Sequence, residues 1–484
     1  MKKQLIKDII ITGFILLTAC TPKPEHVKTS DALPPVYPDY TDVTIPCNIA
    51  PLNFMLRTDA DAMQVKVTGI SDSIIIYGES KISFPIKAWK KLLFENTGKE
   101  LNVEVTARIK GEWIKYKTFK WDIVEDMIDG YLSYRLIEPG YEVWNTIQLC
   151  ERNLENFDER VIADNNQLNQ SCMNCHIYGN QSGQLSMFHI RGKNGGTILN
   201  RDGKLRKLAM KTGNMVSPTV YGAFHPSGKF AVFSTNIVIP EFHMQGNKRM
   251  EVYDTASDVV VADFTENKIL SSTLLSDSTV FETFPVFSAD GKYVYFCSAP
   301  AVILPKEIKK LKYSLCRIAF DAEKKEFGNK VDTLWNARLT NKSINFPKTS
   351  PDGKYMLYSV SDFGTFPIWH RETDLQLMNL MTGATDNLVI VNSDKSDTYH
   401  SWSSNSRWFV FASKRDDGQY GKPYFAYIDK SGKVHKPFVL PQKNPEYYDE
   451  TFKSFNIPEL SKSKLPYDAA DIEKAYNMPA ESFK

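Results

Sequence analysis

The sequence predicts an all-β chain, in which a small β-sandwich is followed by a six-bladed β-propeller. Two observations support this prediction. A segment that opens with an aromatic residue recurs four times, from Tyr221, Phe284, Phe346 and Tyr399, and internal repeats are typical of folds built from one supersecondary unit. Upstream, apolar and polar residues alternate along residues 101–109, which is the pattern of a half-buried strand.

Each repeat predicts a strand, a tight polar turn and a second strand. The copy from Phe346 contains Ser-Pro-Asp-Gly, which suits a type I turn with glycine at a positive φ. A further antiparallel pair follows each copy, as at residues 250–255 and 259–264. Four antiparallel strands make one propeller blade.

Two more blades are predicted from weaker signals. Residues 182–188 match the turn and strand at residues 227–233, and residues 131–163 offer three strands without the turn motif. Strand material at residues 447–457 would complete the last blade, because an open propeller leaves two unpaired edges. The propeller is therefore predicted over residues 128–460, with a C-terminal tail at residues 461–484.

The β-sandwich is predicted over residues 41–127. The alternating strand at residues 101–109 continues through the turn Lys110-Gly111-Glu112 into a second strand, which together indicate a hairpin. Residues 64–67 and 74–77 add strands, and residues 87–94 suggest a short helix.

The N-terminus predicts an exported lipoprotein. Residues 1–19 combine a lysine-rich start with a short apolar run, and they end in Leu-Thr-Ala before Cys20, which resembles the lipobox of bacterial lipoproteins. That resemblance implies cleavage before Cys20, lipid on its thiol and attachment to the periplasmic leaflet of the outer membrane. An ordinary signal peptide with an incidental Cys20 is the alternative. Residues 20–40 are rich in Pro, Ser and Thr and are expected to form a flexible tether.

Charge excludes a nucleic-acid binder. The full chain carries a net charge of +2. Loss of three lysines and one aspartate with the signal peptide leaves about zero, whereas nucleic-acid-binding domains normally show a basic surface.

The strongest functional signal is Cys172-Met-Asn-Cys175-His176, a C-x-x-C-H motif that is typical of covalent c-type haem attachment. Two thiols at this spacing form thioethers with the porphyrin vinyl groups, and His176 would be the proximal iron ligand. His189 is the predicted distal ligand. Met187 is an alternative, since the strand alternation places it on the same face, and a five-coordinate iron is also open.

Other interpretations of the two motif cysteines remain open. A redox dithiol normally lies in a βαβ unit, and a structural zinc site needs two more ligands than the sequence offers nearby. The third interpretation is that Cys172 and Cys175 form a surface disulfide. Cys297 and Cys316 lie on predicted neighbouring strands, so that a bridge between them also stays open.

The other histidines and a glycine-rich segment are given structural interpretations. His225, His243, His370 and His400 are taken as structural or solvated residues. Residues 191–196 do not match a phosphate-binding loop, and the cations there are expected to lie beside the haem propionates.

The repeats resemble the TolB-like, WD-like β-propeller motif. Residues 44–54, 134–141, 187–192 and 413–418 also resemble a TolB-like lipoprotein family of Gram-negative anaerobes that carries one C-x-x-C-H and is labelled cytochrome c biosynthesis-like. This resemblance spans about residues 41–460 and implies the same architecture without assigning a reaction. The predicted function is a haem c-binding outer-membrane lipoprotein, an electron-transfer or redox-complex subunit whose propeller docks envelope or redox protein partners. Whether it is an enzyme is left open, since a haem with an open iron site could also act on a substrate. The alternative is a TolB-like scaffold for envelope assembly with structural haem or none.

Overall fold

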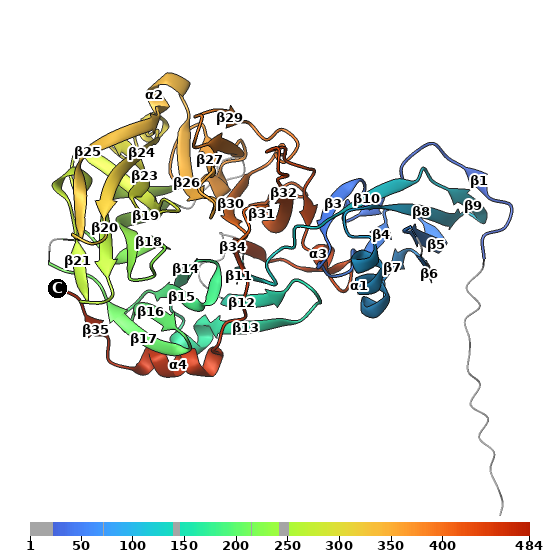
Figure 1. The fold of residues 1–484 in the computed structure, drawn as a ribbon, viewed down its shortest axis with the longest axis horizontal. Coiled ribbons are helices and arrows are strands. Elements are labelled where there is room, and N and C mark those ends of the chain that lie inside the picture. Colours follow the sequence, from blue (N-terminus) through green and yellow to red (C-terminus); the bar gives the residue numbers. More distant parts are fainter. Residues whose placement is uncertain (1–22, 71, 139–145, 214, 242–250) are drawn as a thin grey trace, which may run out of the picture.

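The computed structural model describes residues 23–70, 72–138, 146–213, 215–241 and 251–484. The signal peptide and Cys20 therefore lie outside the described residues, as does His243. Strands dominate the described chain (Figure 1), so that the all-β prediction is confirmed. Among these residues, no helix is both long and apolar enough to cross a membrane.

Two sheets and one helix form the N-terminal part. The larger sheet has seven strands and the smaller has three, and the helix predicted at residues 87–94 is α1 (Ile86–Glu95). The larger sheet contains β1 (Lys28–Thr29), β3 (Val43–Pro46), β5 (Ala60–Thr68), β6 (Ser73–Gly78), β8 (Glu100–Ile109), β9 (Glu112–Lys115) and β10 (Phe119–Val124), and the smaller contains β2 (Val36–Tyr37), β4 (Phe54–Leu56) and β7 (Lys81–Ile82). Strands β1 and β2 thus lie in the segment expected to be a tether, because backbone pairing with β9 and β4 holds them.

Six further sheets follow along the chain, and we number them sheet 1 to sheet 6. Sheet 1 contains β11 (Tyr131–Ile137), β12 (Ile147–Asn153), β13 (Glu159–Asp164) and β34 (Ser454–Ser461). Sheet 2 contains β14 (Met173–Gly179), β15 (Ser182–Ile190), β16 (Gly196–Arg201), β17 (Lys204–Ala209) and β35 (Glu481–Ser482). Sheet 3 contains β18 (Thr219–Phe224), β19 (Phe230–Glu241), β20 (Glu251–Asp263) and β21 (Lys268–Leu270).

Sheets 4 to 6 each have four strands. Sheet 4 contains β22 (Val280–Phe287), β23 (Tyr293–Pro300), β24 (Ser314–Asp321) and β25 (Glu326–Trp335). Sheet 5 contains β26 (Ser343–Thr349), β27 (Tyr355–Ser361), β28 (Asp374–Asn379) and β29 (Thr385–Asp386). Sheet 6 contains β30 (Asp397–Trp402), β31 (Trp408–Ser413), β32 (Lys422–Tyr427) and β33 (Phe438–Val439). Helix α2 (Ala337–Thr340) lies between sheets 4 and 5, and α3 (Tyr447–Glu450) precedes β34.

The six sheets lie around a common centre (Figure 1). One strand of each contacts the equivalent strand of the next sheet, in the order β14, β18, β22, β26, β30, β34 and back to β14. We call these the inner strands. The polar turns of the four repeats lie between the inner strand and its neighbour, and Gly353 in the Ser-Pro-Asp-Gly turn has φ 71°, as the sequence predicted.

The C-terminal segment is part of the fold and not a free tail. Helix α4 (Ala469–Asn477) contacts strands of sheets 1 and 2, and β35 pairs with β17 in parallel. Phe483 is buried in the apolar cluster between sheets 2 and 3. Residues 461–484, predicted as a C-terminal tail, therefore bury apolar side chains against sheets 1, 2 and 3.

One apolar core is shared by the N-terminal part and sheet 6. Trp408 on β31 donates its indole N–H to the Asp126 carbonyl at 2.7 Å, and the Ser404 hydroxyl donates to Asp129 at 2.6 Å. These contacts join the end of the N-terminal part to the sheet that lies farthest from it in the sequence.

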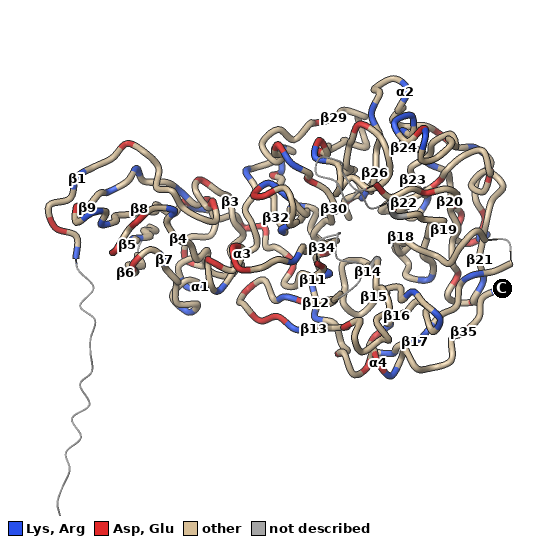
Figure 2. Tube along the Cα trace, turned by 180° about the vertical axis from the view of Figure 1, so that it is seen from behind, with Lys and Arg blue, Asp and Glu red and all other residues tan. Residues whose placement is uncertain are grey.

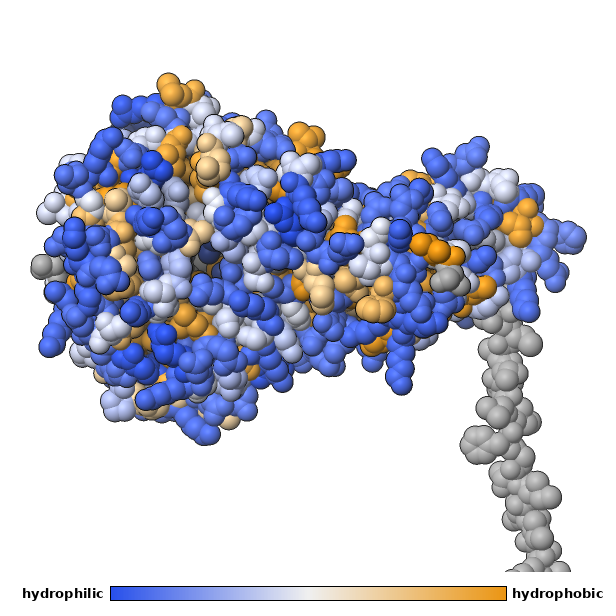
Figure 3. Space-filling view, viewed as in Figure 1, coloured by the Kyte–Doolittle hydropathy of each residue, from blue (hydrophilic) through white to orange (hydrophobic). Residues whose placement is uncertain are grey.

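The surface shows little bias of charge or hydropathy. Lysines and arginines are interspersed with acidic residues along the trace (Figure 2), as the near-zero net charge led us to expect. Apolar residues are scattered over a mainly hydrophilic face, and a hollow opens near the middle of the six sheets (Figure 3).

Cys297 and Cys316 are not bonded to each other. They lie on the neighbouring strands β23 and β24, but Cys297 pairs with Leu315, one residue before Cys316. Side chains alternate between the two faces of a strand, and the two thiols accordingly pack in different apolar clusters. A bridge between them is therefore excluded by the register of this sheet.

Candidate functional site at the inner strand of sheet 2

The C-x-x-C-H motif lies on an inner strand and not in a loop. Cys172 precedes β14, and the other four motif residues belong to it. The side chain of Cys175 is outside what the structure describes. The motif therefore runs directly into a strand that borders the central axis.

A bulge interrupts each inner strand at an equivalent place. The register with the neighbouring strand breaks between Asn174 and Ile177 in β14, and the same break occurs at residues 220–223, 283–286, 345–348 and 398–401. The first bulged residue in those four strands is Tyr221, Phe284, Phe346 or Tyr399, each at φ 47° to 52°. By register, Cys175 takes the position of these aromatic residues, and His176 takes that of Gly222, Pro285, Pro347 and His400.

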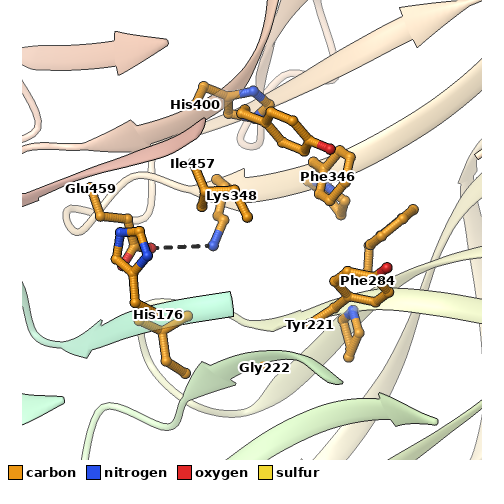
Figure 4. Close-up of a pocket in the computed structure, with 13 residues that line it drawn as sticks. His176, Tyr221, Gly222, Phe284, Phe346, Lys348, His400, Ile457 and Glu459 are labelled. Carbon is orange, nitrogen blue, oxygen red and sulfur yellow. Dashed lines mark ion pairs between the residues drawn. The ribbon is translucent and has the colours of Figure 1, made fainter. Parts of the chain in front are cut away.

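The bulged residues line a cavity on the central axis (Figure 4). The cavity has a volume of about 50 Å³. Its polar lining comes from His176, His400, Lys348 and Glu459, and its apolar lining comes mainly from the four aromatic residues and Ile457. Phe366 packs against Tyr221 and Phe284 at centroid distances of 6.1 and 6.3 Å, which adds a further ring to this aromatic group.

His176 is a neutral, buried imidazole. Only 5 % of the residue is exposed, and Nε2 has no hydrogen-bond partner among the described residues. Burial, together with the positive charge of Arg135, lowers its pKa to about 3. A neutral imidazole with a free nitrogen is the form that binds a metal ion.

Three other polar groups line the cavity: Lys348 and Glu459, which were not singled out from the sequence, and His400, which was taken as structural or solvated. The Nζ atom of Lys348 lies 3.6 Å from Glu459 Oε1, while Glu459 Oε2 has no partner among the described residues. Burial raises the pKa of Glu459 to about 7, although Lys348 opposes that shift. The Nε2–H group of His400 donates to the Leu357 carbonyl at 2.9 Å, and burial lowers the pKa of His400 to about 3.

A second cavity continues along the axis. Its volume is about 150 Å³, and it shares Ile177, Gly222, Lys348 and Glu459 with the first. Its other lining residues include turn residues between inner strands and their neighbours, such as Ser288 and Ser350. The Lys348–Glu459 ion pair therefore lies at the boundary between the two cavities and lines both of them.

Cys172 lies on a different cavity from His176. It lines an open groove of about 670 Å³ with Arg191, Lys193, Asn194 and Tyr476. Tyr476 comes from α4, so that the C-terminal segment forms one wall of this groove. The groove combines a thiol with two cations and no acidic side chain.

His189 lines none of these three cavities. It lies on β15 opposite Asn174, and its Nδ1 is 3.1 Å from the Thr197 hydroxyl. Burial lowers its pKa to about 4. Met187 is buried two residues earlier on the same strand, in the cluster between sheets 2 and 3. The structure thus places His189 beside the motif strand but does not bring it together with His176.

No group of three or more His, Cys, Asp or Glu side chains suited to a metal ion occurs within the described ranges. This finding covers described protein ligands and does not include the porphyrin nitrogens that hold iron in a haem.

Comparisons with known proteins give weak likenesses. No protein-family model and no curated protein matches the chain. Among solved structures, a puromycin-hydrolyzing peptidase of Mycobacterium tuberculosis is similar at 10 % identity and a TM-score of 0.36, covering 86 % of this chain and 57 % of its own. A structure from a study of two prolyl endopeptidases is similar at 12 % identity and a TM-score of 0.35, and the match covers 65 % of this chain and 42 % of the chain in that structure. A DUF4784 family protein from Bacteroides caccae is similar at 8 % identity and a TM-score of 0.28, covering 74 % of this chain and 97 % of its own. Likenesses at this level assign no activity to this chain.

Proposed function

We propose that sheets 1 to 6 are the blades of a closed six-bladed, TolB-like β-propeller behind an N-terminal β-sandwich. The ring of contacts between inner strands supports closure. So does the make-up of sheet 1, where β34 from near the C-terminus pairs with β11. A propeller assembled from both ends of its chain in this way leaves no unpaired inner edge.

We propose further that the chain is a lipid-anchored envelope protein that carries one covalent haem c. The complete C-x-x-C-H motif, with a buried and neutral His176 whose Nε2 is unpartnered, is the observation that carries this proposal. Arg191 and Lys193 supply cations beside Cys172, and propionates are the haem groups that such cations would bind. Haem would supply one-electron chemistry.

The described arrangement of the motif does not by itself fit a haem. Cys172 and His176 line separate cavities, and the cavity beside His176 measures about 50 Å³, whereas ligand cavities are usually about 300–1,000 Å³. An extended strand also advances about 3.3 Å per residue, which spreads the motif along β14. Attachment through both cysteines and His176 therefore requires a different local arrangement of residues 172–176.

In this proposal the protein is an electron-transfer or redox-complex subunit and not an enzyme. The described chain offers faces of mixed charge for partner proteins (Figure 2). The chain's own residues keep His176 uncharged and hold the Lys348–Glu459 pair on the axis.

The test is a pyridine haemochrome spectrum of protein matured in cells that make c-type cytochromes. We expect one covalent haem per chain, which is lost when Cys172→Ala and Cys175→Ala are combined, because no thioether can form. Cys316→Ala, a buried thiol outside the motif, should keep the haem. His189→Ala tests the distal ligand, and a change from a low-spin to a high-spin spectrum with the attachment intact would support it. A haem-free wild type would contradict the proposal.

A second candidate is a TolB-like, non-enzymatic scaffold for envelope proteins, with structural haem or none. The separation of Cys172 from His176 into different cavities favours it. A haem-free chain that still binds its envelope partners would select this function.

A further inference from the structure

The groove that contains Cys172 is built from three separate segments, which are the residues before β14, the loop between β15 and β16, and the end of helix α4. Hydrogen bonds join these segments. The Asn194 amide donates to the Tyr476 carbonyl at 3.0 Å, and the Asn169 amide donates to the Tyr476 hydroxyl at 3.3 Å. The backbone N–H of Arg191 donates to the Cys172 carbonyl at 2.9 Å. The walls are therefore held in place by the fold, and the volume of about 670 Å³ lies within the usual range of ligand sites, about 300–1,000 Å³.

Two cations give this groove a positive charge that no acid in its lining offsets. The half-buried Arg191 and the exposed Lys193 both line it, and no Asp or Glu of the described chain does. The Asn174 side-chain oxygen accepts from the Arg191 guanidinium at 3.2 Å when its amide is oriented to do so, which is a contact with a neutral group. The charge of Arg191 also opposes the rise in pKa that burial gives Asp254, but Asp254 does not line the groove.

A third cation, Lys207, lies behind two of the lining residues. Only 3 % of Lys207 is exposed, and its Nζ donates to the Asn194 side-chain oxygen at 3.0 Å and to the Tyr476 carbonyl at 2.7 Å. Both acceptors are neutral, whereas a buried charge in a protein is normally paired with an opposite charge. Because both acceptors line the groove, an anion bound there would bring a negative charge close to Lys207.

The chemistry of the lining selects the kind of ligand. A guanidinium binds a carboxylate through two parallel N–H donors, and a lysine ammonium can hold a second carboxylate as a compact charge. The Ser171 hydroxyl and the Gln170 amide also line the groove, and both can donate to carboxylate oxygens. A ligand that fits is therefore polar and carries two negative groups, one for each cation.

We propose that the groove beside Cys172 binds a small organic molecule with two carboxylate groups, one held by Arg191 and the other by Lys193. The two propionates of a haem have the same chemistry, so that a haem attached at Cys172 would occupy these cations itself. The chain without haem is therefore the form in which the groove takes a separate dicarboxylate. This makes the test of the groove independent of the test of haem attachment.

The experiment titrates the wild-type chain, made in cells that do not mature c-type cytochromes, with sodium succinate at constant ionic strength and measures the heat of binding. Succinamide is the neutral control, since it has the same carbon skeleton without the charges. Sodium propionate has one carboxylate. We expect succinate to bind at one site per chain and succinamide to give no heat of binding. Propionate should bind about 3- to 10-fold more weakly than succinate, as expected for the loss of one exposed ion pair.

Three variants place the binding in the groove. Arg191→Gln should weaken succinate binding about 10- to 100-fold, because it removes a charge-assisted pair of hydrogen bonds. Lys193→Gln, at an exposed position that leaves the fold intact, should weaken it about 3- to 10-fold. Lys204→Gln changes an exposed lysine on β17 outside the groove and should bind like the wild type. No binding by the wild type, equal binding of succinamide, or an affinity unchanged in both groove variants would each overturn the proposal.

Discussion

Four titratable side chains on the axis line one small cavity, and three of them keep a nitrogen or oxygen atom without a described partner even though Lys348 and Glu459 form an ion pair. His176 Nε2, His400 Nδ1 and Glu459 Oε2 have no partner among the described residues, although all three residues line the same space. A cavity of about 50 Å³ has room for about two water molecules, since each takes roughly 30 Å³ in the liquid. Water bridging these atoms is therefore the physical expectation, and it would connect His176 to the Lys348–Glu459 pair.

The raised pKa of Glu459 makes stability depend on pH. The carboxyl titrates near 4.5 when it is not perturbed and at about 7 in the fold. The native state thus binds more protons between these values, and the free energy of unfolding falls as pH rises from about 4.5 to about 7. Above about pH 7 the full cost, roughly 3 kcal/mol, is present. Glu459→Gln should remove this contribution, so that urea unfolding shows the variant to be more stable than the wild type at about pH 8.

The matched control is Glu323→Gln, which changes an exposed glutamate in the turn after β24. Its unfolding free energy should follow the wild type at both ends of the pH range. A wild-type stability that stays level from about pH 5 to about pH 8, with Glu459→Gln parallel to it, would contradict the assignment.

At the scale of elements, the repeats predicted the strands and turns well. The turn at Ser350 and Gly353 and the strands around it follow directly from local sequence. The role of the leading aromatic residue was not predictable, because a bulge and its positive φ depend on pairing with a neighbouring strand. For the same reason the sequence identified His176 but did not indicate that Lys348, His400 and Glu459 would join it.

The sequence also did not predict how the C-terminal segment packs against the sheets. Its helix begins at a capping box in which the Asp468 side chain accepts from the backbone of Ala470 and Asp471, but nothing local shows which sheets it contacts. The parallel pairing of β35 with β17 comes from the tertiary fold, which joins residues 208 and 481.

Phe483→Ala tests the structural role of this segment. Phe483 is 8 % exposed and packs against Phe264 at a centroid distance of 6.3 Å. Removing a buried aromatic ring costs about 3 kcal/mol, and chemical denaturation should show a loss of that order. Glu473→Ala on the exposed face of α4 is the control and should change stability by less than about 0.5 kcal/mol. Equal stability of the two variants would mean that the segment does not stabilise the fold.

At the scale of the whole molecule, the N-terminal part and sheet 6 act as one structural unit. Their shared apolar core means that the boundary near residue 128, which was drawn from the sequence, does not separate two cores. Local alternation revealed the strands on each side of that boundary, but contacts between residues some 280 positions apart, such as Trp408 with Asp126, leave no local signal.

The anchor prediction concerns the molecule's place in the cell. Cys20 follows an apolar segment and a small residue, and we predict that lipid on its thiol attaches the protein to the outer membrane. Each buried acyl CH₂ contributes about 0.8 kcal/mol to membrane binding. Because the net charge of the mature chain is about zero, electrostatic attraction to the membrane would not replace this binding energy. Cys20→Ser should therefore move the protein from the membrane fraction to the soluble periplasmic fraction of lysed cells. Cys47→Ser, at a half-buried thiol, should leave the protein in the membrane fraction. If Cys20→Ser protein remained there after an alkaline wash, the attachment would have to come from a protein partner or another part of the chain.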